Sequence, residues 1–376
     1  MLNTAKLMIY EVILLLAKIK LRKQSTDNDT ILLIKTDELG DYILFRNYIT
    51  LIAATYGSGK KIIFVGNQMW KNLFDNFDRH PSIIATYWVD KGLFKSKMLY
   101  RYQLLKQISH LNAGTAINMV YSRTRRHEDA IVSVAAAPLK IAYTGNTDNA
   151  LPIEKPFNKN LYAQLINVPD KLHDFLKHRL FLQQLKGQEI KVPELEIPRV
   201  SNNSFSLPEK PYVLIFPGSG KPEKIWTTDK FIDVANFITK TLGFNICLCG
   251  SKADVPHAIN FITNFTGDVT DYCGKTNMIQ VIELIQKSQF TVSIDTGSVH
   301  LSAACNVPAF AVYNGIHYGR FAPYPAELRK NIYPIYPDEV EKQLLRNMTD
   351  EIIVGDYNDV TAEKLIKAIK LFKQLS

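Results

Sequence analysis

The segment that most restricts the fold of this chain runs from Gln289 to Pro308, with the sequence QFTVSIDTGSVHLSAACNVP. Its first half, Phe290 to Ile294, is short, apolar and rich in β-branched residues, which predicts a buried strand. Its second half, Val299 to Cys305, is small and apolar and predicts a helix packed closely on that strand. A strand that turns directly into a helix is the repeating unit of a parallel α/β fold.

The turn between these elements reads Asp295-Thr296-Gly297-Ser298 and is followed by His300 in the first helical turn. Unpaired backbone N–H groups and the positive end of the helix dipole meet at such a turn, so it is suited to bind a phosphate. The alternative is an ordinary helix cap followed by a histidine with purely structural contacts. The turn alone does not decide between the two.

Length and composition indicate two globular domains and an anionic partner. The chain has 376 residues, of which 46% are apolar, and a formal net charge of +9. A basic chain favours nucleic acid, an anionic membrane surface or phosphorylated substrates. Because no nucleic-acid motif or aromatic stacking pattern accompanies the charge, we expect no nucleic-acid partner.

The four cysteines are not spaced as a disulfide framework or a metal knuckle, which fits a reducing compartment. Cys247 and Cys249 fall on alternate positions of a strand-like run, where core packing is the expected role. We therefore predict no structural zinc.

The N-terminus begins with a strongly apolar segment, Leu7 to Leu21, followed by Arg22 and Lys23. It is too short to span a bilayer and lacks a small-residue cleavage site. We expect an amphipathic helix within residues 1–24, either lying on a membrane or packed on the protein body. Both interpretations stay open.

Apolar runs alternate with helical segments along the rest of the chain. Strands are expected at 31–35, 62–66, 86–90, 116–120 and 139–145, and helices at 68–77 and 171–185. A stretch rich in Pro, Ser and Asn near residue 200 predicts a linker. The alternation resumes at Tyr212, with a helix that we expect to be capped by Thr228 and with a last amphipathic helix. We expect an N-terminal domain over 25–205 and a C-terminal domain over 206–376, both Rossmann-like and facing each other across a cleft.

The first strand leads into Gly40-Asp41. A carboxylate at the carboxyl end of a strand faces the ligand side of such a sheet, where it can take a proton from a substrate hydroxyl. The glycine allows close approach of the backbone. The alternative is that Asp41 only caps the following helix.

Three further groups are candidates for binding anions. Ser219, Gly220, Lys221 and Lys224 form a basic loop after a strand, and Thr276 ends the short loop Cys273–Thr276. Arg123, Arg125 and Arg126 form a basic cluster that either binds an anionic acceptor or is a solvated face. For the lysines, the alternative is that they are ordinary solvated surface residues. For Thr276, the alternative is an ordinary loop, because no Walker-type spacing surrounds it.

Two patterns are missing from the sequence. No Gly-x-Gly-x-x-Gly follows the first strand, which disfavours a dinucleotide oxidoreductase. No Asp-x-Asp lies at a strand end, and no group of His and Asp residues suggests a catalytic metal. We therefore expect metal-independent chemistry without a cofactor.

Four segments, in order, resemble glycosyltransferase family 9, the heptosyltransferases that transfer ADP-heptose to the lipopolysaccharide inner core. They are ILLIKTDELGDYILFRNYI, VLIFPGSGKPEKIWTTDKFIDVANFI, DYCGKTNMIQVIELIQKSQ and FTVSIDTGSVHLSAACNVPAFAVYNG. Four motifs in the family's order are far more specific than one. The resemblance implies an α/β, GT-B fold in which the N-terminal domain binds the acceptor and the C-terminal domain the nucleotide sugar.

By position, the resemblance makes Asp41 the general base. Gly40 and the three arginines, which lie in the predicted N-terminal domain, are the candidate acceptor-binding residues. It places the donor-binding residues at Ser219, Gly220, Lys224, Asp254, Thr276, Asp295, Thr296, Gly297 and His300. Asp254 would hold the ribose. The chain departs from the family at Asp37-Glu38-Leu39, where Ser and small or apolar residues are usual, and in its N-terminal helical extension.

The resulting hypothesis is an inverting glycosyltransferase that moves a heptose-like sugar from a nucleotide-diphospho-sugar to a lipopolysaccharide or other lipid-linked glycan. Such an enzyme would work in the cytoplasm, peripherally on the inner face of the bacterial inner membrane. Two alternatives remain: a non-catalytic nucleotide-sugar-binding protein and another GT-B enzyme such as a nucleotide-sugar epimerase. The sequence does not indicate an oligomeric state.

Overall fold

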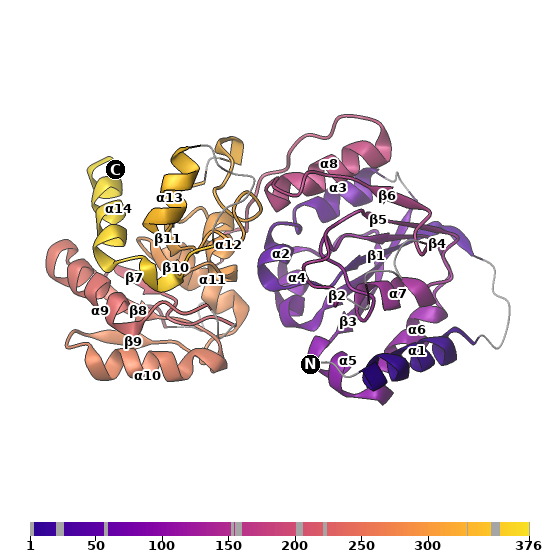
Figure 1. The fold of residues 1–376 in the computed structure, drawn as a ribbon, viewed down its shortest axis with the longest axis horizontal. Coiled ribbons are helices and arrows are strands. Elements are labelled where there is room, and N and C mark those ends of the chain that lie inside the picture. The colour runs from indigo at the N-terminus through magenta and orange to yellow at the C-terminus, as the bar shows by residue number, and fades with distance from the viewer. Residues whose placement is uncertain are drawn as a thin grey trace. The chain divides into compact units, whose positions relative to one another are not determined.

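The computed structural model describes residues 4–19, 26–55, 59–151, 154, 160–200, 206–220, 224–328, 330–346 and 354–375 (Figure 1). The chain divides into two compact units, Met1–Pro193 and Glu194–Ser376. Lys221 and both ends of the predicted N-terminal helix, residues 1–3 and 20–24, lie outside the described residues.

The first unit contains a six-stranded sheet with the order β3-β2-β1-β4-β5-β6, in which all pairs are parallel. Its strands are β1 (Asp27–Lys35), β2 (Lys61–Asn67), β3 (Ile83–Val89), β4 (Ala113–Asn118), β5 (Leu139–Tyr143) and β6 (Gln164–Ile166). The chain runs outward from β1 to β3 and then returns to the other side of β1. The carboxyl ends of β1 and β4 therefore form a topological switch point, where open α/β sheets bind ligands.

The second unit repeats this plan, with the parallel order β12-β11-β10-β7-β8-β9. Its strands are β7 (Tyr212–Ile215), β8 (Asn245–Leu248), β9 (Val269–Asp271), β10 (Thr291–Ile294), β11 (Ala309–Val312) and β12 (Ile332–Ile335). The switch point lies between β7 and β10. All four residues of both strands are buried, as expected for a sheet covered on both faces.

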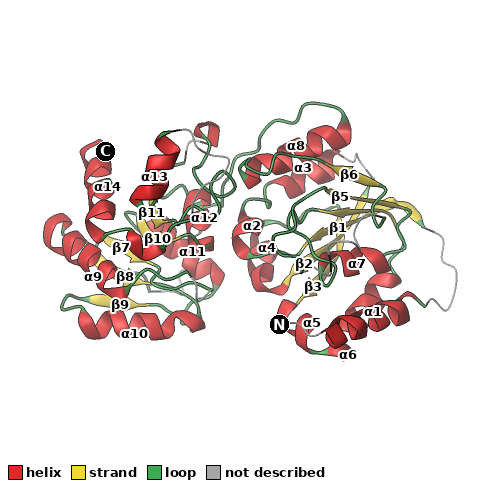
Figure 2. Ribbon diagram, in the orientation of Figure 1, coloured by secondary structure: helices red, strands yellow, loops and turns green. Residues whose placement is uncertain are grey.

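Helices cover both faces of the first sheet (Figure 2). They are α1 (Thr4–Lys18), α2 (Leu39–Ile43), α3 (Tyr48–Thr55), α4 (Lys71–Phe77), α5 (Lys91–Ser96), α6 (Met98–Ser109), α7 (Glu128–Val134) and α8 (Asp174–Lys186). Apolar side chains of α1, α5, α6 and α7 share one core with the central strands.

The second sheet is also covered on both faces (Figure 2). Its helices are α9 (Thr228–Phe237), α10 (Val255–Asn264), α11 (Met278–Lys287), α12 (Gly297–Ala304), α13 (Asp338–Leu345) and α14 (Ala362–Leu375). The terminal helix α14 contributes Leu365 and Ile369 to the core, as its amphipathic sequence predicts.

The α/β fold with two Rossmann-like units is confirmed, and most predicted elements are present. The helix expected at 68–77 is a 3-10 turn followed by α4, and the helix expected at 171–185 is α8. The N-cap residue of α9 is Thr227, whereas Thr228, the predicted cap, is the first residue of the helix. The short strands β6 and β12 were not predicted, because β6 has three residues and β12 contains a proline.

The N-terminal helix α1 packs on the protein body. Tyr10, Ile13, Leu14 and Ala17 are buried, and the last three belong to the core shared with α6 and α7. No helix among the described residues combines the length and apolar character needed to cross a bilayer.

Candidate functional site

In the first unit, Asp41 is half-buried in the first turn of α2, which follows β1 after a three-residue loop. The next residue anchors this short helix: the Tyr42 ring stacks on Trp70 with centroids 3.7 Å apart. The Tyr42 hydroxyl donates to Oδ2 of Asp78 at 2.5 Å, and Arg46 donates to Oδ1 of Asp78 at 2.6 Å. Asp41 is therefore held at the switch point by a fixed helix.

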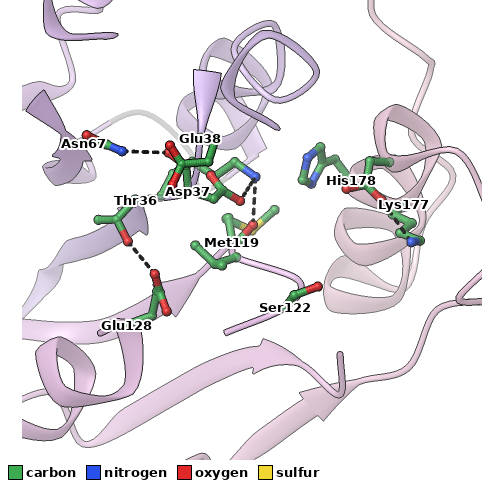
Figure 3. A network of polar contacts seen from close by, with 12 residues as sticks. Thr36, Asp37, Glu38, Asn67, Met119, Ser122, Glu128, Lys177 and His178 are labelled. Carbon is green, nitrogen blue, oxygen red and sulfur yellow. Dashed lines mark hydrogen bonds and ion pairs between the residues drawn. The ribbon is translucent and has the colours of Figure 1, made fainter. Parts of the chain in front are cut away.

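The loop from Thr36 to Glu38 carries a polar network (Figure 3). Thr36 donates to Glu128 of α7 at 3.1 Å, and Lys91 of α5 donates to Glu38 at 2.8 Å. The backbone oxygen of Asp37 accepts from the side chains of Asn67 and Trp70 at 3.1 and 3.2 Å. These contacts tie the loop to its neighbours on both sides.

Asp37 also brings a second carboxylate to the end of β1. Its Oδ2 lies 2.9 Å from Nζ of the buried Lys35, which also donates to the backbone oxygen of Met119 after β4. Burial raises the pKa of Asp37 to about 7, Lys35 acts against this rise, and the nearby Asp41 carboxylate adds to it. Of the two acidic residues, Asp37 is thus paired within the loop, whereas Glu38 is exposed.

Helix α8 places a further polar group near this loop, which the sequence did not single out. Phe45 lies between β1 and α8: its ring is 5.2 Å from Nζ of Lys35 in β1 and 5.2 Å from the ring of His178 in α8. The Tyr143 hydroxyl is 2.7 Å from Nδ1 of His178, and Lys177 lies over the Tyr121 ring. The sequence signal for this group is that Lys177 and His178 fall on the buried side of α8, where charged residues are rare.

The three arginines make internal contacts. Arg123 is buried, donates to the backbone oxygens of Tyr143 and Thr144, and pairs with Asp129 at 3.3 Å. The solvated-face interpretation is therefore wrong for Arg123. The other two pair with Glu11 of α1 (Arg125, 2.8 Å) and with Glu154 (Arg126, 2.5 Å). These pairs support the fold, and a role in acceptor binding stays a prediction.

In the second unit, Lys224 and Asp295 meet at the switch point. Nζ of Lys224 lies 2.8 Å from Oδ2 of Asp295 and donates to its backbone oxygen at 2.7 Å. Asp295 is buried and directly follows β10. The loop after β7 and the turn after β10 are therefore joined by a charged pair.

The turn after β10 is the N-terminus of α12, as predicted. Thr296 is the N-cap residue, and its hydroxyl is 2.8 Å from that of Ser298. Gly297 begins the helix. The first backbone N–H groups of α12 and the positive end of its dipole are thus beside the Lys224–Asp295 pair.

His300 is buried within α12. Its Nδ1 is 2.5 Å from the Tyr324 hydroxyl, and its ring packs edge-on against Phe321 at 5.4 Å. These are the contacts of a structural histidine. Its predicted role at the donor phosphates stays untested, and the pairing with Tyr324 had no signal in the sequence.

Asp254 lies in the loop after β8 and packs closely against Gly218 of the loop after β7. Its Oδ2 accepts from the backbone N–H and hydroxyl of Ser251 at 2.7 and 2.8 Å, which completes a capping box. A Cβ built on Gly218 would lie 2.1 Å from Oδ1 of Asp254, so only glycine fits there. Asp254 thus positions the loop after β7, and its predicted contact with a ribose stays a prediction.

The remaining donor candidates lie on neighbouring loops. Ser219 is half-buried after β7, and Gly220 is exposed, with open space where a Cβ would stand. Thr276 follows β9 beside the buried Cys249, whose pKa is raised to about 12 by burial. The parallel sheet therefore brings the ends of β7, β8, β9 and β10, and all predicted donor residues in the described part of the chain, to one edge.

The cysteines in the described part of the chain do not form part of a metal site. Cys247, Cys249 and Cys273 are buried thiols, and Cys305 is half-buried. Core packing of Cys247 and Cys249 is confirmed. Within the described ranges, no group of three or more His, Cys, Asp or Glu side chains is placed to hold a metal ion.

Comparison with known proteins gives a consistent family. The profile of glycosyltransferase family 9 (heptosyltransferase) matches residues 157–347. A lipopolysaccharide core heptosyltransferase, OpsX of Haemophilus influenzae, is 30% identical over 135 residues, which cover 35% of this chain and 38% of that protein. The sequence match thus spans well under half of this curated relative.

Two solved structures have the same fold. A family 9 glycosyltransferase from Veillonella parvula has a TM-score of 0.67 at 17% identity, covering 94% of this chain and 99% of that one. The heptosyltransferase WaaC of E. coli, solved with ADP, has a TM-score of 0.63 at 15% identity, covering 92% and 98%. The likeness extends over both units, which together have the GT-B fold. Since the profile matches just over half of the chain, this protein belongs to glycosyltransferase family 9.

Proposed function

We propose that this protein transfers a heptose-like sugar from a nucleotide-diphospho-sugar to a hydroxyl of a lipopolysaccharide or related lipid-linked glycan, with inversion. Asp41 takes the proton of the acceptor hydroxyl, whose oxygen attacks the anomeric carbon of the donor. The bond from that carbon to the diphosphate oxygen breaks, and the nucleoside diphosphate leaves with the electron pair. The second unit stabilises the negative charge that develops on this leaving group.

The observation that carries the proposal is the repeated position of the candidate groups. Asp41 follows β1 and Asp295 follows β10, each at the switch point of its sheet. Ligands of open α/β sheets bind at this position. One unit thus offers a fixed carboxylate for proton transfer, and the other offers a lysine and a helix N-terminus for a diphosphate.

The pairing of Lys224 with Asp295 supports the donor assignment. An ammonium group has three donors, so a lysine that contacts two oxygens of Asp295 retains capacity for a phosphate oxygen. The buried carboxylate fixes the direction of the lysine side chain. The alternative, a purely structural ion pair, predicts that nucleotides bind equally well without Lys224.

The proposed donor and acceptor rest on the relatives. The named relative is a lipopolysaccharide core heptosyltransferase, and the E. coli structure holds ADP. ADP-heptose is therefore the first donor to test. The profile match begins at residue 157, so the assignment of Asp41 rests on the N-terminal motif and on its position after β1. Because the acceptor is lipid-linked, the proposed place of work is the inner face of the inner membrane.

Lys224 and the α12 N-terminus take the charge-neutralising role that a metal ion has in other glycosyl transfers. We accordingly propose metal-independent transfer, without a cofactor. Turnover should then continue in the presence of a strong chelator. Loss of turnover in chelator, restored by a divalent cation, would contradict this part of the proposal.

The deciding experiment combines binding with product analysis. Thermal unfolding is first followed with ADP, UDP and GDP and their sugars, because a ligand at about 100 times its dissociation constant stabilises a protein by about 2.7 kcal/mol. The stabilising sugar nucleotide is then supplied in labelled form with a truncated lipopolysaccharide core. Label in the glycan supports the proposal. Binding without turnover indicates a binding protein, and an altered sugar without acceptor indicates an epimerase.

A further inference from the structure

Helix α1 is apolar on two opposite sides. One side is buried in the core of the first unit through Ile13, Leu14 and Ala17. The other side carries Met8, Ile9, Val12, Leu15 and Leu16, and Ile19, directly after the helix, continues it through a hydrogen bond to Leu16. These six large apolar side chains are each 47% to 65% exposed. At 100° per residue these six positions fall within one continuous arc of about 120°. We call these six residues the outer face of α1.

The outer face is a fixed feature of the first unit. Glu11 accepts two hydrogen bonds from Arg125 at 3.1 and 2.8 Å, and the Tyr10 hydroxyl donates to the backbone oxygen of Lys95 at 2.5 Å. Lys106 donates to the backbone oxygen of Ile19 at the other end of the helix. The helix cannot turn its outer face inward without breaking these contacts and opening the core.

Positive charge surrounds this helix. Lys18 and Lys140 are close enough that each is affected by nearby cations: burial and then Arg125 lower the pKa of Lys18, while burial and then Lys18 lower the pKa of Lys140 to about 8. Glu11, the acidic residue of α1, is paired with Arg125. Arg101 and Arg125 also contact α1, through the Tyr10 ring and through Glu11. In sequence, Lys20, Arg22 and Lys23 follow the helix.

We propose that the outer face of α1 docks the first unit on an anionic lipid bilayer. Its six apolar side chains would lie among the acyl-chain ends, and basic residues beside it, such as Lys18 and Lys140, would contact lipid phosphates. Packing of α1 on the core needs only its buried side. It does not explain why six large apolar side chains face water. This inference deepens the proposed function, because it supplies a membrane contact for a protein with a lipid-linked acceptor. It rests on the proposed function only for the identity of that membrane.

Charge favours a bilayer over a second copy of the chain. In a two-fold dimer built on this face, the same lysines of both copies would be brought together. Like charges at close range oppose such contact, whereas anionic headgroups neutralise them. A second copy is therefore the competing outcome of the test below.

The test replaces three outer-face residues in the full chain: Met8→Gln, Val12→Gln and Leu15→Gln. Truncating the helix is unsuitable, because it would also expose the core. The matched control replaces three exposed apolar residues of the second unit, Ile259→Gln, Ile262→Gln and Leu371→Gln. A third variant, Lys18→Gln with Lys140→Gln, tests the charge. Thermal unfolding checks that each variant is folded.

Flotation is measured without donor or acceptor, on vesicles of phosphatidylglycerol with phosphatidylethanolamine and on phosphatidylcholine vesicles. The wild type and the control should float with the anionic vesicles. The outer-face variant should partition about 100-fold less. The lysine variant should lose the preference for anionic over neutral lipid.

Two results would overturn the inference: equal flotation of the outer-face variant and the wild type, or no flotation of the wild type. A wild-type dimer that the outer-face variant dissociates, with no vesicle binding, would assign the face to a second copy. Transfer to a soluble, delipidated acceptor separates this inference from the proposed function, because the outer-face variant should keep full activity there.

Discussion

The Lys224 ammonium lies 2.8 Å from the Asp295 carboxylate, although 71 residues separate them in sequence. The pair joins the loop after β7 to the N-terminus of α12, which follows β10. The strands β7 and β10 are hydrogen-bonded neighbours. Positive charge is thereby fixed beside the backbone N–H groups that would face a diphosphate.

Replacing Lys224 by Ala should weaken binding of a nucleoside diphosphate at least about tenfold, since a charge-assisted contact is lost. It also leaves the buried Asp295 without its partner, which should cost about 3 kcal/mol of unfolding free energy. Calorimetric titration well below the unfolding midpoint separates the two effects. Lys342→Ala is the control, because Lys342 pairs with Glu339 on the surface of α13. Unchanged nucleotide affinity would make the Lys224 pair purely structural.

Asp41→Asn keeps the size of the side chain and removes the base. Turnover should fall by about 10² to 10⁴, while donor affinity is unchanged. Asp29→Asn at the opposite end of β1 is the matched control, because Asp29 is exposed and pairs with Lys60. Steady-state transfer and donor titration give the two quantities. A fully active Asp41→Asn protein would remove Asp41 from the mechanism.

Gly218→Ala should destabilise the second unit by about 1 to 3 kcal/mol, because the new methyl group would meet the Asp254 carboxylate. Gly220→Ala, two residues later, has open space around its Cβ position and should change unfolding free energy little. Denaturant unfolding of both variants measures the difference. Equal stabilities would mean that Asp254 does not hold the loop after β7.

Asp37 should make stability depend on pH. Its pKa is raised from 3.8 to about 7 in the folded protein, so the folded state binds the proton more tightly than the unfolded state. This contribution is present below pH 4 and is lost as the pH rises to about 7, at up to about 1.4 kcal/mol per pH unit. Asp37→Asn should remove it.

The measurement for Asp37 is the difference between two curves. Unfolding free energy of the wild type and of Asp37→Asn is determined from pH 4 to pH 8, so that other titrating groups cancel. Among these are Asp129, with a pKa raised to about 6 by burial, and His127, with a pKa lowered to about 4 by burial. Parallel curves would show that Asp37 titrates as an ordinary exposed carboxylate.

Local sequence patterns account for the sheet and for the edge on which the site lies. Asp295 and Asp41 follow apolar strands, so their position needs only the rule that parallel strands end at one edge. The contacts of His300 with Tyr324 and of Asp254 with the Gly218 loop depend on residues distant in sequence. They follow from packing, which periodicity does not encode.

The N-terminal helix shows the same limit. Its apolar sequence allowed packing or membrane contact as alternatives, because the sequence does not show how much of a helix the core covers. The structure shows a covered side and an exposed one, both apolar. The arginine cluster was likewise ambiguous, since the partners Glu11, Asp129 and Glu154 come from three separate segments.

The placement of the cysteines allows the second unit to be followed by thiol chemistry without a contribution from the first. All four lie in the second unit, and three of them are buried. Burial holds the pKa of Cys249 at about 12, so its thiol reacts with alkylating reagents only after local opening. With Cys305 replaced by Ser, the rate at which the three buried thiols are modified therefore reports how often the unit proposed to bind nucleotide opens. Slower labelling with a nucleotide sugar present would register binding in that unit alone.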